Sequence, residues 1–271
     1  MDMTVKKSKS SENKFSTIIN KIDDRIWVLI SFLLAILVWQ LISMTEAGGV
    51  IFASPTEVIS ALITQMQKGK IWTHIGKSLF RVLGGFSFGL IAAIPVAFLM
   101  GWYKVFRNIV EPWIQFIRTI PPIAYIPLVI VGAGIGESSK IIVIFIASFL
   151  VMVVSIYQGV RNVDATLIKA ARVLGAKDST IFLKVVVPAS LPFILVGIRL
   201  GLAAALTTLV ASELTGAQAG LGTMIQEASL YFQMDIVLLG IVIIGVIGIT
   251  LEKFVKFLER RLTGWQETHQ A

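Results

Sequence analysis

Cysteine is absent from this chain of 271 residues, and charged residues are few. Without cysteine the chain can form neither a disulfide nor a thiolate metal site. Only 15% of the residues are charged and 56% are hydrophobic, whereas about a quarter of the residues in soluble domains are charged. This composition excludes an ordinary soluble domain and indicates a polytopic membrane protein. The two histidines, His74 and His269, are isolated and indicate no metal site.

A phosphate-binding loop is also missing. The pattern G-x4-G-K-[ST] occurs nowhere, so the chain cannot hydrolyse ATP by that route. The glycine-rich stretch "GAGIGE" (132–137) follows an apolar run and precedes no dinucleotide-binding unit. We interpret it as a turn. A membrane enzyme would need a cluster of nucleophiles, bases or metal ligands, and none is visible without cysteine and with two distant histidines.

Long apolar runs dominate what is present. A helix needs about 20 residues to cross the hydrocarbon layer, or rather fewer if it is broken or short. Six segments qualify and predict an all-α membrane protein with about six transmembrane helices: 26–44, 82–103, 119–136, 141–160, 188–212 and 236–251. Pro121, Pro122 and Pro127 predict that the third of them is kinked, since proline interrupts a helix.

Basic residues are distributed unevenly between the two sides of these spans. With the N-terminus inside, the inner segments hold 18 Lys and Arg residues and the outer segments hold 4. Cytosolic loops of membrane proteins are enriched in Lys and Arg. Both termini are therefore predicted to be cytosolic, with tails at 1–25 and 259–271 around a membrane domain at 26–258. The segment 104–118 becomes an inner amphipathic loop, in which we expect Glu111 and Arg118 to be solvated, with contact to a cytosolic partner as the less favoured alternative.

A charged stretch at 164–187 separates the fourth and fifth spans on the inner side. Asp164 can cap a helix, and Gly175 is a plausible left-handed stop. The apolar positions of this helix recur on one stripe: Leu167, Ala170, Ala171 and Leu174. A second short helix can begin at Asp178, and Pro188 suits the first turn of the next span. We expect two short helices, joined at a glycine and held at both ends by spans. On the helix pattern alone, an amphipathic loop lying at the lipid headgroups is an equal alternative.

The spacing within this stretch resembles the EAA loop of binding-protein-dependent ABC importer permeases, whose pattern is E-A-A-x3-G-x9-I-x-L-P. Here it stands as Lys169-Ala170-Ala171, then Gly175, then nine residues to Val185-Val186-Val187-Pro188. Lys169 departs from the usual Glu. The resemblance makes the headgroup alternative much less favoured.

The resemblance extends along most of the chain and points to one branch. "FASPTEVISAL" (52–62), "HIGKSLFRVLGGFSFG" (74–89) and "IRTIPPIAYIPLVIVGAGIGESSKI" (117–141) look like the nitrate, sulfonate and taurine permeases. "GIRLGLAAALTTLVASEL" (197–214) is similar to their fifth span. "RRLTGWQE" (260–267) resembles the end of taurine permeases in particular, which also tend to carry a basic residue at the place of Lys169.

The resemblance implies a non-catalytic permease with a MetI-like fold in the bacterial inner membrane. Two copies would form the pathway, two ATPase subunits would bind ATP and Mg²⁺, and an external solute-binding protein would deliver the substrate. Contact with the ATPase is expected at these residues: Leu167, Lys169, Ala170, Ala171, Arg172, Leu174, Gly175 and Pro188. Taurine is the first expected substrate, other alkanesulfonates the second, and nitrate or a pyrimidine precursor the third.

Two arginines are candidates for the substrate pathway. Arg199 lies 11 residues beyond Pro188, about 16 Å along the helix, where a charge must face the bundle interior or water. It can attract an anionic substrate or pair with a carboxylate or carbonyls of another span. Arg81 is a weaker candidate, because near the outer surface it can simply extend its charged end into water.

The outer segment 213–235 contains acidic residues but neither Lys nor Arg. We expect "GLGTMIQEAS" to form a short helix that packs back into the bundle. Glu213 and Glu227 are candidates for docking the binding protein, with a merely solvated helix end as the alternative for Glu213. An ion-coupled secondary transporter is the rival class, but it would require intramembrane carboxylates or repeats, and neither is visible.

Overall fold

The computed structural model describes residues 24–45, 48–49 and 52–262. All regular elements of this described part are helices, and it contains no strand. The predicted all-α fold is thereby confirmed. The chain divides into two compact units, residues 1–61 and 62–271.

The predicted tails at 1–25 and 259–271 lie largely outside the described residues, as does most of the segment 260–267 that resembles taurine permeases. The division into tails and a membrane domain therefore stays a prediction.

The first unit holds α2 (Asp24–Ser43) and the start of α4 (Pro55–Gln67). The side chains of α2 are largely exposed and apolar, as expected for a helix that faces lipid. α4 begins with a reciprocal cap. The backbone N–H of Ser54 donates to Glu57 Oε2 at 2.6 Å, and the N–H of Glu57 donates to Ser54 Oγ at 3.3 Å. This capping box satisfies donors that the helix itself leaves unpaired, and the Ser54 N–H lowers the pKa of Glu57.

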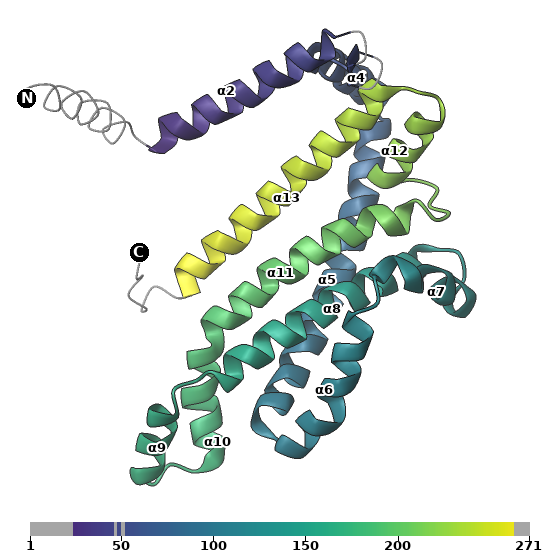
Figure 1. Ribbon diagram of the computed structural model, residues 1–271. Helices are drawn as coiled ribbons and strands as arrows, with labels where there is room; N and C mark the ends of the chain where they lie inside the picture. Colours follow the sequence, from purple (N-terminus) through teal and green to yellow (C-terminus); the bar gives the residue numbers. More distant parts are fainter. Residues whose placement is uncertain (1–23, 46–47, 50–51, 263–271) are drawn as a thin grey trace, which may run out of the picture. The chain divides into compact units, whose positions relative to one another are not determined.

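The second unit contains the remaining helices (Figure 1). In chain order they are α5 (Lys70–Trp102), α6 (Lys104–Arg118), the 3₁₀ turn η1 (Pro122–Tyr125), α7 (Ile126–Ala133), α8 (Glu137–Arg161), α9 (Ala165–Val173), α10 (Asp178–Ile181), the π-helical η2 (Phe182–Val186), α11 (Val187–Glu213), α12 (Leu221–Leu230) and α13 (Met234–Leu262).

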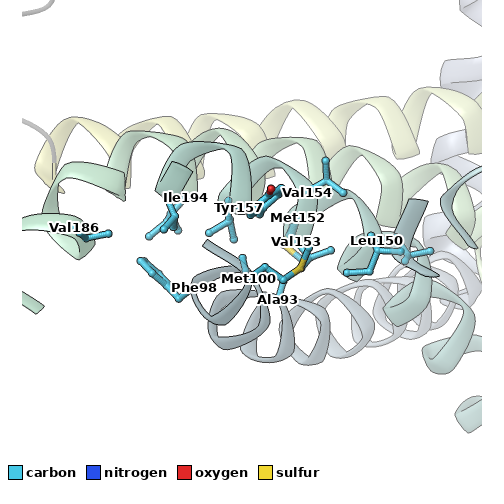
Figure 2. Packing of buried hydrophobic residues seen from close by; sticks show 14 of the residues in the cluster. Ala93, Phe98, Met100, Leu150, Met152, Val153, Val154, Tyr157, Val186 and Ile194 are labelled. Atoms are coloured by element: carbon cyan, nitrogen blue, oxygen red, sulfur yellow. The ribbon is translucent and has the colours of Figure 1, made fainter. Parts of the chain in front are cut away.

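The core of this unit forms where α8 packs against both α5 and α11. Figure 2 shows its larger cluster, to which α5 contributes Phe98 and Met100 and α8 contributes Met152 and Tyr157. A second cluster joins α5, α8, α11 and α13 through Val82, Ile144, Leu202, Ala205, Leu209 and Val255. These apolar side chains are buried among helices, whereas many others on the outside of the bundle are exposed.

Glycines allow the three central helices to approach closely. A Cβ at Gly85 of α5 would lie 2.6 Å from Ile144 Cγ2 and 2.9 Å from the carbonyl oxygen of Ile141. A Cβ at Gly201 of α11 would meet the side chain of Met152. Small residues at helix interfaces are typical of membrane bundles, where close backbone contact replaces the hydrophobic driving force.

Within the described residues, five helices are long and apolar enough to cross a membrane: Ile26–Ser43 of α2, α5, α8, the run Asp178–Glu213 and α13. The third predicted span, 119–136, is wrong as a single helix. In its place α6 and the segment Pro122–Ala133 form a pair bent by 95°. α7 has eight residues, about 12 Å at 1.5 Å per residue, which is too short to cross alone.

Two adjacent prolines cause this bend. Pro121 and Pro122 lack a backbone N–H, and proline disfavours the helical conformation in the residue before it. α6 therefore ends at Arg118, and the chain restarts as a 3₁₀ turn. The segment 104–118 is thus one arm of the bent pair, and Ile114 on it is buried in the core.

Candidate functional site

The module of residues 164–187 folds as two short helices, as predicted. Asp164 Oδ1 accepts from the backbone N–H of Thr166 at 2.8 Å, which caps α9 and lowers the pKa of Asp164. Gly175 ends this helix with a φ of 76°, in the left-handed region that glycine adopts without strain. The second helix, α10, begins at Asp178. Pro188 lies in the first turn of α11.

The apolar residues of α9 lie on two faces. Ile168 and Ala171 pack against the core. Leu167, Val173 and Leu174 are exposed, the last two at 87% and 86%. Of the predicted stripe, only Ala171 is thus turned inward. The outer face is apolar surface that the described part of the chain leaves uncovered.

The polar residues of the module lie beside that face. Lys169 and Ala170 are exposed. Arg172 makes an exposed ion pair with Asp178, with 3.5 Å between Arg172 Nη2 and Asp178 Oδ1. Exposed pairs contribute little to stability, but this one joins the two short helices across the glycine.

Aromatic packing ties the module to the bundle. The ring of Phe182 makes edge-to-face contacts with two aromatic rings of α5. The distance between ring centroids is 5.5 Å to Phe98 and 5.2 Å to Trp102. Ile181 is fully buried beside Phe182. The inner side of the module therefore packs against α5, and its outer side, on α9, is exposed.

A buried ion cluster lies at the other end of the bundle, which we call the α12 end. Arg81 Nη1 donates to Glu213 Oε1 at 2.7 Å. Arg81 also donates to both carboxylate oxygens of Glu137, from Nε to Oε2 at 2.6 Å and from Nη2 to Oε1 at 2.8 Å. The side chains of Arg81 and Glu213 are 1% and 0% exposed. The expectation that Arg81 extends into water is wrong, because its side chain is buried and pairs with the buried Glu213 and with the partly exposed Glu137.

Glu213 also fixes the loop before α12. Ser78 Oγ donates to its Oε1 at 2.7 Å, and the backbone N–H of Gly222 donates to its Oε2 at 2.7 Å. A Cβ at Gly220 would collide with this carboxylate. The solvated helix end considered for Glu213 is wrong: its side chain is turned into the protein, where a docking protein cannot reach it.

The loop has two further ties to α5. Arg81 NH1 donates to the carbonyl oxygen of Ala219 at 2.7 Å, and His74 Nδ1 lies 2.8 Å from the carbonyl oxygen of Gly220. α12 then packs its buried residues against the bundle, as the sequence predicted for "GLGTMIQEAS".

The remaining predicted residues lie apart from this cluster. Arg199 NH2 is 3.3 Å from Glu259 Oε1 of α13, with side chains 32% and 27% exposed. Of the two roles considered for Arg199, attraction of an anionic substrate and pairing with a group of another span, the structure shows the second. Glu227 is exposed on α12 and lines a cleft together with Lys68 and Lys70. No group of three or more His, Asp or Glu side chains suited to a metal occurs within the residues that the structure describes.

A cleft of about 380 Å³ lies where the bent pair meets α8 and α11. Its lining is mostly small or apolar, with one charged side chain, Arg118. Arg118 is exposed, as the sequence predicted, but it also lines this cleft, which the sequence analysis missed. The available signal was the double proline, which ends α6 at Arg118.

Residues 85–264 match the model of the family described as "Binding-protein-dependent transport system inner membrane component". The chain belongs to this family. Its members are permease subunits of ABC importers, which work with a separate ATPase subunit and a binding protein. The chain is accordingly a non-catalytic inner membrane component.

Several relatives cover most of the permease. A probable ABC transporter permease protein of Brucella abortus is 52% identical over 88% of this chain and 95% of its own length. The taurine transport system permease protein TauC of Escherichia coli is 36% identical, with 84% of each chain covered. A putative aliphatic sulfonates transport permease protein of Bacillus subtilis is 34% identical over 87% of this chain and 86% of its own.

A solved structure shows the same fold. The permease in an inward-facing structure of the MetNI methionine ABC transporter superposes with a TM-score of 0.64, covering 71% of this chain and 96% of that one, at 20% identity. The predicted MetI-like fold is confirmed.

Proposed function

We propose that this permease imports taurine and related aliphatic sulfonates into the cytoplasm. The observation that carries the transport mechanism is the exposed apolar face of α9, presented by a module that is anchored on α5. The substrate class is supported by the likeness to the two sulfonate-related permeases. Two copies of the chain would form the pathway, with both termini in the cytosol.

In this proposal α9 lies in a groove of the ATPase, which binds ATP and Mg²⁺. A helix that places apolar side chains in a groove is a common mode of recognition. Leu167 and Leu174 would enter the groove, with Lys169, Ala170 and Arg172 beside them. The contacts of Phe182 with α5 would transmit movement of the module to the bundle. The binding protein would dock at the α12 end, where Glu227 is exposed.

Replacing Leu174 with aspartate is expected to lower the binding-protein-stimulated ATPase rate of the purified transporter on the order of tenfold, as for the loss of an apolar anchor at an interface. Thr180→Asp is the matched control, because it adds the same charge to an exposed position of the module without removing apolar surface. An equal loss in both variants would contradict a specific role for the apolar face.

The absence of cysteine permits a direct test of contact. A single cysteine at Ala170 is expected to crosslink to a cysteine placed in the ATPase groove. Failure of every such pair in an active transporter would argue against the docking mode.

The substrate is tested by uptake of labelled taurine into vesicles that contain the permease, its ATPase and its binding protein. We expect uptake that requires ATP and is inhibited by excess unlabelled taurine and, more weakly, by other alkanesulfonates. Nitrate or a pyrimidine precursor should not compete. Inhibition by nitrate and not by sulfonates would refute the proposed substrate class. Uptake driven by an ion gradient without ATP would indicate a secondary transporter.

A further inference from the structure

We propose that Arg118 contacts the anionic group of the substrate as it passes through the cleft between η1, α8 and α11. The inference rests on the proposed import of sulfonates and names a residue that determines specificity for them. Neither Arg81 nor Arg199 takes this part, because each is paired with carboxylates of the same chain.

The cleft has the dimensions of a ligand site. Its volume of about 380 Å³ lies within the roughly 300–1,000 Å³ of small-molecule pockets. Three alanines keep it open on the helices that flank it: Ala147, Ala204 and Ala211. Larger side chains at these positions would fill the space.

The charge of the cleft suits an anion. Among the described residues that line it, Arg118 is the one charged side chain and no carboxylate is present. The structure also gives Arg118 no ion-pair partner among the described residues. A planar guanidinium binds oxyanions through paired hydrogen bonds, and the three oxygens of a sulfonate accept them.

The bend holds Arg118 at this place. Tyr125 Oη donates to the carbonyl oxygen of Ile117 at 2.9 Å, which ties η1 to the last turn of α6. Thr119 Oγ1 donates to the carbonyl oxygen of Phe116 at 2.7 Å within the same turn. The same two carbonyls also accept from the backbone N–H groups of Thr119 and Ile120, which close the last turn of the helix. The arginine thus stands on a fixed helix end and not on a loose loop.

A polar stripe along α6 continues from the cleft toward the end that carries α9. Its residues recur three or four positions apart and share one face: Lys104, Arg107, Glu111, Gln115 and Arg118. Three of them are basic and one is acidic, and Glu111 accepts a long hydrogen bond of 3.4 Å from Tyr157. A net positive stripe favours the passage of an anion.

The first test uses the complete transporter in vesicles, with its ATPase and binding protein. Arg118→Gln is expected to lower taurine uptake on the order of tenfold or more, the worth of a hydrogen bond to a charged group, while the binding-protein-stimulated ATPase rate stays near that of the wild type. Arg118→Lys should keep part of the uptake. Lys253→Gln, which removes an exposed cation of α13 outside the cleft, should leave uptake unchanged.

The second test separates charge from folding within a single variant. Arg118→Cys, in a chain with no other cysteine, is modified with 2-aminoethyl methanethiosulfonate or with 2-sulfonatoethyl methanethiosulfonate. The first reagent restores a positive charge and should raise uptake at least threefold above that of the unmodified variant. The second adds a negative charge and should not. Wild-type transporter treated in the same way reports any effect on cysteines of the partner proteins.

The outcomes distinguish this inference from the function on which it rests. If the wild type imports taurine and Arg118→Gln imports it equally well, or both reagents have the same effect on Arg118→Cys, the role of Arg118 is refuted and sulfonate import stands. If the wild type imports no sulfonate, the proposed function fails and this inference falls with it.

Discussion

Arg81→Met is expected to destabilise the permease by about 3–5 kcal/mol, the usual cost of removing one partner of a buried ion pair. The variant leaves Glu213 at 0% exposure without its cation. The remaining donors to that carboxylate, Ser78 Oγ and the N–H of Gly222, are neutral. The amount of permease in the membrane and its thermal unfolding midpoint in detergent would both fall.

Arg199→Met is the matched control for this prediction. Its pair with Glu259 is about one-third exposed on each side, and such pairs contribute about 0–1 kcal/mol. In addition, Arg81→Met combined with Glu213→Gln should be less destabilising than the sum of the two single changes, because the double variant buries no unpaired charge at Glu213. Equal unfolding midpoints for Arg81→Met and Arg199→Met would contradict the assignment of a compensated buried cluster.

Gly85→Ala is expected to destabilise the contact between α5 and α8 by about 1–3 kcal/mol, as overpacking does in a filled core. The added methyl group would lie 2.6 Å from Ile144 Cγ2 and 2.9 Å from the carbonyl oxygen of Ile141. The second neighbour is backbone and can move aside only if the helices separate. The thermal unfolding midpoint of the purified permease measures this effect.

The adjacent glycine provides the control. A Cβ at Gly84 would lie 3.7 Å from the nearest atom of Ile141, an ordinary contact. Both changes replace glycine in the interior of one helix, which alone favours the helix by about 0.5–1 kcal/mol. Gly84→Ala should therefore be neutral or stabilising. A similar loss of stability in both variants would show that the close approach at Gly85 is not the cause.

The sequence predicted those features that depend on neighbouring residues. Long apolar runs located five of the six predicted spans, Asp164 and Gly175 marked the ends of α9, and the spacing of the 164–187 module indicated the family. Each of these signals is contained in a short window, where helix capping and hydropathy act directly on the local conformation.

Features that join distant residues were not predictable in the same way. Arg81 meets Glu137 and Glu213, which are 56 and 132 positions away, and Arg199 meets Glu259, 60 positions away. Hydropathy judges each charged residue only by its neighbours in the sequence and does not show its partner in space. Arg81 and Glu213 were therefore expected in water. The double proline indicated a kink in the third span, but a bend of 95° depends on how the arms pack. The cleft at Arg118 depends on that bend.

The run from Asp178 to Glu213 is helical over 36 residues, through α10, η2 and α11. At 1.5 Å per residue it is about 54 Å long. One end begins in the 164–187 module, and the other carries the carboxylate that fixes the loop before α12. Within this run the π-helical η2 and Pro192 inside α11 interrupt the regular hydrogen bonding of an α-helix. Movement of the module can thus travel along one continuous element to the loop before α12, and these two places are where that element can bend.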